Sequence, residues 1–364
     1  MGKLKEFIKS YIPLWVLISF FILSSSVLLY LFSAIFSGFA DFINGSISHA
    51  LRFLLSKIST IVHFSLFEVC IILALPLLAL LIFLALRGKK DFKRMLRGVF
   101  NLLGIIAVLY SLYLFMLAIG YRTTPLSQRL KLDERAEISK EELYSLTERI
   151  RDEVNSLEGE ITFEDGESRI CYDLDTLSEK LTEGYERVSK KYPFIPGFSS
   201  RVKPVAFSGV MSDMGIMGIY GYFTGEANIN TSYPDYTVPY TAAHEMAHQR
   251  GIARENEANF VAFLVCIECD DAYIKYSGYL NLYEYLASAL YRTDKELYKE
   301  ILAGLSERAL GDLRASAAIS ESHKDSFINK VMDKVNDFYL KSNGTEGSVS
   351  YGYVVRLAAA YYRE

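Results

Sequence analysis

Three long apolar runs without charged residues constrain the fold of this chain more than any other feature. Residues 10–40, Val69–Leu86 and Gly98–Tyr121 contain no Asp, Glu, Lys or Arg. A helix needs about 20 apolar residues to cross the hydrocarbon core of a bilayer. The sequence therefore predicts a membrane domain over residues 1–121 with three transmembrane helices, at about 12–38, 69–86 and 98–120.

The first run has a second interpretation, because Lys3, Lys5 and Lys9 precede it as they would in a signal peptide. The apolar core of a signal peptide is about 7–15 residues long, and this run exceeds that length. Two further runs also follow it. We therefore expect a retained span.

Basic residues around the runs predict their orientation. The segment between the second and third runs carries six of them: Arg87, Lys89, Lys90, Lys93, Arg94 and Arg97. The segment between the first two runs has only Arg52 and Lys57. The positive-inside rule then predicts a multi-pass protein of the cell membrane, with a cytoplasmic N-terminus and residues 122–364 as an extracytoplasmic domain. That domain is net acidic, which argues against nucleic acid as a partner.

A helical period also appears between the first two runs, over about residues 44–65. The apolar residues that recur there are Ile47, Leu51, Leu54, Leu55, Ile58 and Val62. A helix with one apolar side and one polar side lies in the plane of a membrane surface. The pattern predicts an interfacial amphipathic helix, with membrane lipid as its partner.

The second part of the chain is predicted to be mostly α with a small β-sheet, an α+β fold. Ser139 and Glu142 form a capping box ahead of a helix that ends near Leu157. Three short β-type runs follow further on: Lys203–Val210, Gly215–Tyr222 and Ala227–Asn230. Helical periods return after them and continue to the end of the chain.

The run His244-Glu245-Met246-Ala247-His248 carries the clearest chemical signal. Residues four apart share one face of a helix, so both imidazoles can bind one ion. Glu245 is rotated by about 100° and can reach a water on that ion without binding the ion itself. Two histidines, one carboxylate and an open position make a catalytic zinc site. We expect Zn2+ as the cofactor and Glu245 as the general base.

The flanks of this motif favour the zinc interpretation over an ordinary amphipathic helix with two polar histidines. Pro239 suits the first turn of a helix, and Gly251 is a natural helix stop at positive φ. A second helix with acidic residues at its start follows at once.

The third metal ligand cannot be a histidine placed as in metzincins, because that position holds Arg254. The nearest acids are Glu255 and Glu257, which diverge by about 200° on a helix, so only one can face the metal. Glu255 shares its face with Asn259, which could support a ligand from the second shell. We expect Glu255 to be the ligand, with Glu257 as the alternative. The other glutamate is expected to be solvated or paired with Arg250 or Arg254.

At these residues the chain resembles known families. Glu255-x-x-Ala258-Asn259 is similar to the E-x-x-A-D element of membrane zinc peptidases of the HtpX and CAAX prenyl protease type, with Asn259 in place of the final Asp. That resemblance implies a glutamate as third zinc ligand. A closer resemblance is to an uncharacterised family of three-span bacterial membrane proteins with a gluzincin-like core, known as a domain of unknown function. It rests on Phe64–Glu68, Phe223–Asn230, the zinc motif and Ser350–Val355. It implies a zincin-like domain and a metal site, but no substrate.

Two further roles are expected near the motif. A strand with an open edge ahead of the zinc helix can pair with an extended peptide, and this role falls to Glu226, Ala227, Asn228, Ile229 and Asn230. An edge strand that binds nothing is the alternative. Donors for the oxyanion of a hydrolysed carbonyl are sought among Tyr276, Tyr279, Tyr351, Arg356 and His323.

Together these patterns predict a membrane-anchored zinc metallopeptidase that hydrolyses a peptide or protein substrate at the membrane surface. A zinc-containing protein with a binding or sensory role in the envelope is one alternative. The intact Glu245 counts against it, because a structural zinc site needs no such base. A zinc hydrolase of a non-peptide amide is the other alternative.

Overall fold

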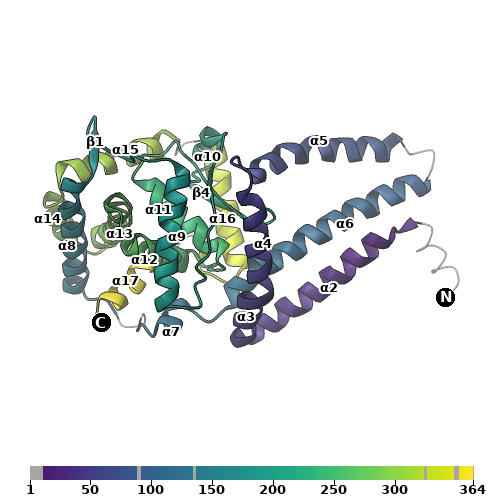
Figure 1. The fold of residues 1–364 in the computed structure, drawn as a ribbon, viewed down its shortest axis with the longest axis horizontal. Helices are drawn as coiled ribbons and strands as arrows, with labels where there is room; N and C mark the ends of the chain where they lie inside the picture. Colours follow the sequence, from purple (N-terminus) through teal and green to yellow (C-terminus); the bar gives the residue numbers. More distant parts are fainter. Residues whose placement is uncertain (1–10, 88–91, 134–136, 324–325, 348–351, 364) are drawn as a thin grey trace.

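The computed structural model describes residues 11–87, 92–133, 137–323, 326–347 and 352–363. Three long helices extend from one side of a globular part, which is mostly helical and contains two small β-sheets (Figure 1). We use "globular part" for residues 122–364.

The three long helices are α2 (Leu14–Ile35), α5 (Leu66–Arg87) and α6 (Phe92–Met116). Each is long and apolar enough to cross a membrane, as predicted. Ser65 caps the start of helix α5, because its hydroxyl accepts a hydrogen bond from the backbone of Glu68 at 3.0 Å. Such a start explains why the helix begins before the uncharged run. The chain is therefore indicated to be a membrane protein.

Between α2 and α5 the chain forms α3 (Ser37–Ile43), a π-helical turn η1 (Asn44–Ser48) and α4 (His49–Thr60). Helix α4 crosses the inner ends of the long helices (Figure 1). Its polar residues Arg52, Ser56 and Ser59 are buried, whereas Leu54 and Ile58 are exposed. Of the helix predicted over about residues 44–65, the structure has the π-helical turn η1 and helix α4, and the polar side of α4 packs on the rest of the protein.

The buried Arg52 side chain links this segment to the turn that follows the histidine motif. Its guanidinium donates to the carbonyls of Asn44 (2.7 Å) and Met116 (3.5 Å). The Asn44 amide donates to the carbonyl of Gly251 at 3.0 Å. A Cβ added at Gly251 would lie 2.4 Å from Arg52 Nη2. This contact and the φ of +94° at Gly251 leave room for glycine alone, as the helix-stop prediction required.

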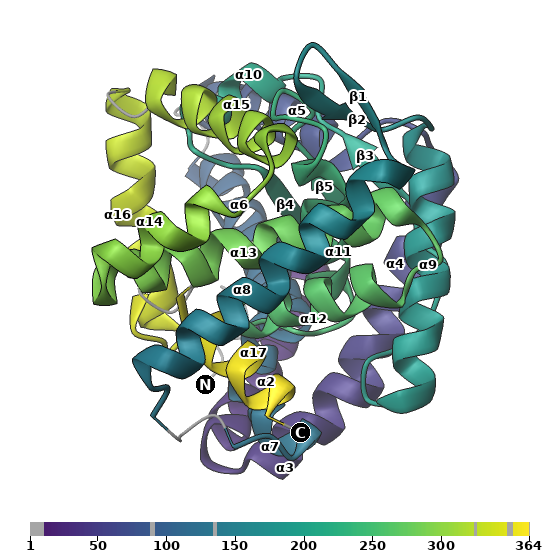
Figure 2. The ribbon, with the colours of Figure 1, turned by 90° about the vertical axis from the view of Figure 1, so that its left-hand side faces the viewer.

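The third long helix leads into the globular part through the 3₁₀ turn η3 (Ala118–Arg122) and helix α7 (Leu126–Leu130). The remaining helices enclose one apolar core in which α12 is buried from Glu257 to Cys266. Figure 2 shows α8 crossing in front of α13, with α11 and α12 behind. Helix bounds are α8 Lys140–Leu157, α9 Leu174–Lys191, α10 Ser208–Asp213, α11 Thr237–Gln249, α12 Glu255–Glu268, α13 Ala272–Thr293, α14 Lys295–Ala303, α15 Glu307–His323, α16 Phe327–Ser342 and α17 Val354–Tyr362, with a 3₁₀ turn η4 at Glu158–Glu160.

The sheet that matters for the site has three short strands in the order β3 (Val202–Pro204), β5 (Glu226–Ile229) and β4 (Gly218–Gly221). Strand β3 is parallel to β5, and β4 is antiparallel to it. A separate antiparallel hairpin joins β1 (Thr162–Glu164) and β2 (Glu167–Arg169).

The strand predicted at Lys203–Val210 was wrong beyond Pro204, because α10 begins at Ser208. The Glu68 carboxylate explains the change. It accepts the backbone N–H groups of Ala206 and Phe207 at 2.9 and 2.8 Å. An anion on these donors favours the start of a helix over continued pairing in a sheet.

Candidate metal centre

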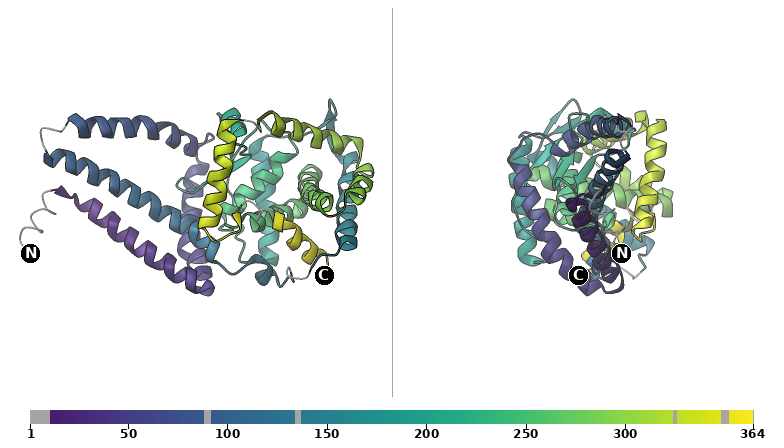
Figure 3. Two further views of the ribbon diagram at one scale, coloured as in Figure 1. Left: turned by 180° about the vertical axis from the view of Figure 1, so that it is seen from behind. Right: turned by 90° about the vertical axis from the view of Figure 1, so that its right-hand side faces the viewer.

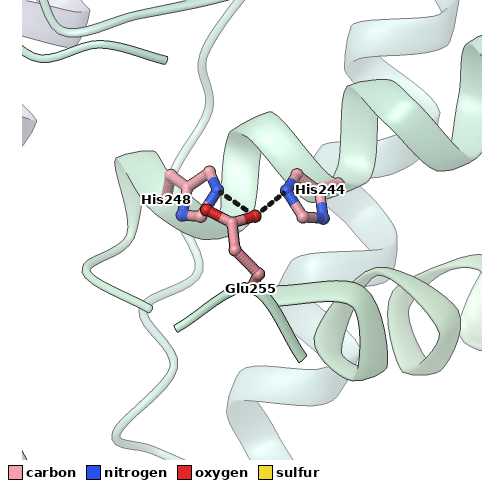
Figure 4. Close-up of side chains that lie close together, drawn as sticks. All are labelled: His244, His248 and Glu255. Atoms are coloured by element: carbon pink, nitrogen blue, oxygen red, sulfur yellow. Dashed lines mark ion pairs between the residues drawn. The ribbon is translucent and has the colours of Figure 1, made fainter. Parts of the chain in front are cut away.

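Helices α11 and α12 bring the two histidines and one glutamate of the motif together. His244 and His248 share a face of α11, and Glu255 is the first residue of α12, after the turn at Gly251. Glu255 Oε2 lies 3.2 Å from His244 Nε2 and 3.5 Å from His248 Nε2 (Figure 4). One ligand atom from each residue lies within 4.8 Å of the others.

These distances fit the edges of a tetrahedral zinc site. Zn–N and Zn–O bonds of about 2.0–2.1 Å at tetrahedral angles place neighbouring ligand atoms about 3.3 Å apart. The His248 Nδ1 atom lies 2.8 Å from the carbonyl of Ile252. A proton on Nδ1 leaves the lone pair of Nε2 free for a metal. The donor set of two imidazoles and a carboxylate therefore suits zinc.

The three side chains are also matched in charge. Burial would lower the pKa of His248, but the Glu255 carboxylate outweighs burial and raises it to about 9. Without a metal the ring thus carries a second proton, on Nε2, which zinc would displace on binding. Burial would raise the pKa of Glu255, but the two imidazoles hold it well below its usual range. Glu255 is thus ionised throughout the physiological pH range and can act as an anionic ligand. The side chains of His244 and Glu255 keep 13% and 12% exposure, which leaves this cluster partly open.

Glu257, the alternative ligand, does not lie with the histidines. Its Oε1 accepts from Arg254 Nη1 and from the backbone of Leu126, both at 2.9 Å. Arg254 also donates to the carbonyls of Tyr121 and Thr123 at 2.9 and 2.7 Å. Glu257 and Arg254 therefore hold the segment that follows the third long helix against α12.

Glu245 lies beside strand β4 rather than among the three possible ligands. A Cβ added at Gly218 would come within 2.6 Å of Glu245 Oε1 and 2.7 Å of Thr241 Cγ2. Burial raises the pKa of the Glu245 carboxyl, and the nearby His244 and His248 oppose that rise. A carboxylate with a raised pKa, held against a strand and next to the histidines, is suited to proton transfer.

Comparison with known proteins places the whole arrangement in one family. The model of a family described as a protein of unknown function (DUF3810) matches residues 43–359. This chain belongs to the DUF3810 family. The matched region begins at the edge of η1, so it includes α4 and two of the three long helices along with the globular part. No curated protein and no solved structure matches the chain.

The DUF3810 chain does not offer the substrate strand that was predicted. Residues Glu226 to Ile229 do form a strand, but β5 is central, with β3 on one side and β4 on the other. All four of its residues are buried. The prediction of an open edge at Glu226–Asn230 was therefore wrong, and within the described residues β4 is the strand next to Glu245 whose outer edge has no ladder partner.

Three members of the predicted strand have structural contacts instead of a free edge. Asn228 donates from its amide to the carbonyl of Ile219 at 3.3 Å, and the Asn230 amide donates to Ser212 Oγ and to the carbonyl of Ile216 at 2.9 and 3.0 Å. Glu226 forms a fully buried ion pair with Lys203. It also accepts the backbone N–H groups of Leu66 and Phe67 at 3.1 and 2.6 Å, and so caps helix α5.

We expect Glu226→Ala to destabilise the DUF3810 chain strongly. The change leaves the Lys203 ammonium buried without its carboxylate, and removing one partner of a buried pair costs about 3–5 kcal/mol. Thermal unfolding of the chain in detergent measures the effect. The double variant Lys203→Met, Glu226→Leu is the control, because it removes the unpaired ammonium and should restore part of the stability. The stability that stays lost in the double variant measures the cap on α5, since leucine cannot accept the N–H groups of Leu66 and Phe67. Unchanged stability of Glu226→Ala with weakened peptide binding would instead support a substrate-binding role.

Asn259 does not support a ligand in the way that was expected. Its backbone carbonyl accepts from the Tyr240 hydroxyl at 3.0 Å. Its side-chain Nδ2 is buried and has no hydrogen-bond partner among the described residues, and its side chain forms a hydrogen bond with Tyr285. The group that bonds the His248 ring is instead the backbone carbonyl of Ile252. Every residue has such a carbonyl, so the residue type at this position gave no signal.

Of the predicted oxyanion donors, Tyr351 lies outside the described residues, and the other four have contacts with residues other than those of the metal centre. The Tyr276 hydroxyl donates to Asp312 at 2.7 Å, and His323 Nδ1 lies 2.8 Å from Asp213. The Tyr279 ring packs on Phe263 with centroids 5.8 Å apart, and Arg356 lies 4.6 Å from the centroid of the Tyr353 ring.

The charge of Glu255 acts on two tyrosines that sequence reasoning passed over. Burial raises the pKa of the Tyr339 and Tyr285 hydroxyls, and the charge of Glu255 contributes to both shifts. Tyr339 comes from α16, and its ring lies 6.4 Å from that of Tyr113 and 6.2 Å from that of Tyr121. The chain has 26 tyrosines and no motif around this one, so no local signal distinguishes it.

Proposed function

We propose that this chain is a membrane-anchored zinc peptidase whose site comprises His244, His248 and Glu255 as ligands and Glu245 as the base. The observation that carries the proposal is the arrangement of four neighbouring side chains. Three donor atoms converge on one point, while the fourth group, Glu245, lies apart against β4. A site built only to hold a metal would not need the fourth group.

Zinc bound there would activate water as a nucleophile and polarise the carbonyl under attack. The protein's own part in the reaction is proton transfer and positioning. Glu245 would take the proton of the attacking water and pass it to the leaving amine, since its raised pKa brings it closer to the pH of reaction. The histidine held by Ile252 keeps its ligand nitrogen in a fixed orientation.

The outer edge of β4 favours a peptide over a small amide. An extended peptide can pair with such an edge through backbone hydrogen bonds. Gly218 at one end of β4 lies against Glu245, so a peptide paired there would pass the base. At the other end, a Cβ added at Gly221 would lie 2.8 Å from the Phe67 ring in the first turn of α5. A four-residue strand spans only about 10 Å.

We infer from this short span that the substrate is a peptide segment close to the membrane surface. The basic residues between the second and third long helices favour a cytoplasmic position for that connection. The globular part would then lie outside the cytoplasm, on the far side of the cell membrane from the N-terminus.

The test uses the full chain, purified in lipid nanodiscs and supplied with zinc. Incubation with a mixture of peptides is expected to give new peptide termini, detected by mass spectrometry, and a zinc chelator is expected to stop their formation. Cleavage of a small amide but of no peptide would favour the non-peptide hydrolase. A zinc-loaded chain that cleaves neither would favour a binding or sensory protein.

A further inference from the structure

Exposed apolar side chains in the globular part are confined almost entirely to two helices. Among its described residues, the large hydrophobic side chains that are exposed are Phe207, Val210, Tyr291, Ile328, Val331, Val335 and Phe338. All except Tyr291 belong to α16 or to the short α10 and the residue that precedes it. We call these six the α10–α16 surface. Such a concentration marks an interaction site, because single exposed hydrophobic residues are normally scattered.

Helix α16 has the pattern of a helix that lies at a boundary. Ile328, Val331, Val335 and Phe338 follow at spacings of three and four, so they share a face. Phe338 is 74% exposed. Leu340 on another face is fully buried, and the Tyr339 ring packs near Tyr113 and Tyr121. The helix therefore has one side in the protein core and a separate apolar side that no other described residue covers.

Contacts with the long helices fix where the α10–α16 surface lies. The segment that leads into α10 is bonded to Glu68 in the first turn of α5. The end of α16 is bonded to α6, because the Tyr113 hydroxyl donates to Asn343 Oδ1 at 2.9 Å. Viewed along the long helices, α16 and α4 lie on opposite sides of them (Figure 3). The surface therefore adjoins the points where two of the long helices leave the globular part.

We propose that the α10–α16 surface rests on the same bilayer that the long helices cross, with its apolar side chains in the boundary between headgroups and acyl chains. The bilayer is favoured over a second protein because the surface adjoins the ends of α5 and α6, two helices that are apolar enough to cross a membrane. The exposed apolar side of α4 would meet the bilayer on the opposite side of those helices. The globular part would then lie flat on the membrane, held at two edges.

This contact would also place the proposed metal centre. The Tyr339 ring of α16 lies 6.2 Å from the Tyr121 ring, and the Tyr121 backbone carbonyl accepts from Arg254, the residue before Glu255. The helix that meets lipid is thus linked to the start of α12, which bears one of the three possible ligands. The membrane contact itself does not depend on zinc or on hydrolysis. The membrane contact can therefore be tested separately from the proposed function, and the result of one test does not decide the other.

Tryptophan fluorescence in lipid vesicles tests the proposal. The chain has one tryptophan, Trp15, so Trp15→Phe gives a dark background in the full-length protein. In that background we place Phe338→Trp, with Val335→Trp as a second reporter on the same face. The vesicles contain phosphatidylcholine brominated near the headgroup end of its acyl chains. The apolar side of an interfacial helix lies about 5–10 Å into the boundary, so each reporter is expected to lose at least about half of its emission.

Tyr291→Trp is the matched control, because Tyr291 is exposed to 47% and lies outside the α10–α16 surface. Its emission is expected to be unaffected by bromine. Quenching of the α16 reporters no greater than that of Tyr291→Trp would overturn the proposal. A blue-shifted emission without bromine quenching would overturn it as well, since it would show that a protein covers the surface.

Discussion

Glu245→Gln is expected to leave zinc bound and to slow peptide hydrolysis by about 10²–10⁴-fold, the usual contribution of a positioned acid–base group. Glutamine has the shape of glutamate but cannot accept a proton, and Glu245 is not among the three groups whose atoms converge. Close packing against Gly218 leaves little room for another side chain to take its place. Initial rates on a peptide that the wild type cleaves, with metal content measured on the same samples, give the comparison.

Glu284→Gln provides a matched control for this change. Glu284 is a partly buried glutamate whose pKa burial raises to about 7, and it accepts from the Tyr236 hydroxyl at 3.3 Å. It takes no part in the proposed site, so its variant should hydrolyse the peptide at the wild-type rate. Wild-type rates in Glu245→Gln would show that the proton is handled elsewhere and that the proposed mechanism is wrong.

Glu255→Ala is expected to lose zinc, whereas Glu257→Ala is expected to keep it. Alanine at 255 removes the carboxylate whose oxygen converges with the ring nitrogens of the two histidines. Changes to groups behind the ligands cost about 10–100-fold in metal affinity, so loss of a ligand should cost at least about 10²-fold. Competition with a chromogenic zinc chelator, on full-length chains in detergent, measures the affinity.

The two variants differ in a second readout. Glu257→Ala removes the partner of Arg254 and leaves the Leu126 N–H unpaired, which should lower stability by about 1–3 kcal/mol without changing zinc affinity. Thermal unfolding distinguishes the two cases. Loss of zinc from Glu257→Ala alone would mean that the wrong glutamate has been assigned as the ligand.

Features governed by local sequence were predicted well. Charge-free runs indicated three apolar helices, and four-residue spacing placed His244 and His248 on one face. The angle between Glu255 and Glu257 predicted that only one of them could face the histidines, which is how the structure arranges them. These inferences succeed because a helix fixes the relation between residues a few positions apart.

Features set by partners distant in the chain could not be predicted in this way. β5 is central because β3 and β4 pair with it on both sides. The sequence of one strand does not show which other strands pair with it. The end of β3 depends on Glu68, more than a hundred residues earlier, which bonds Ala206 and Phe207. Tyr339 packs near Tyr121 from a helix that follows more than two hundred residues later, and the group that bonds the His248 ring is the backbone carbonyl of Ile252 rather than the Asn259 side chain.

The buried Arg52 has a consequence for how such a protein can be divided. Its guanidinium bonds carbonyls of the π-helical turn and of the third long helix, and it packs on the turn that separates His248 from Glu255. The long helices and α4 therefore do more than attach the globular part to a membrane, and other apolar helices could not replace them. A fragment that starts at residue 122 would lack the Arg52 side chain, which packs against the turn between α11 and α12. We therefore expect the spacing of the histidines and the glutamate to be less well fixed in such a fragment. We therefore expect α4 and the globular part to fold as one unit. The family match, over residues 43–359, includes both.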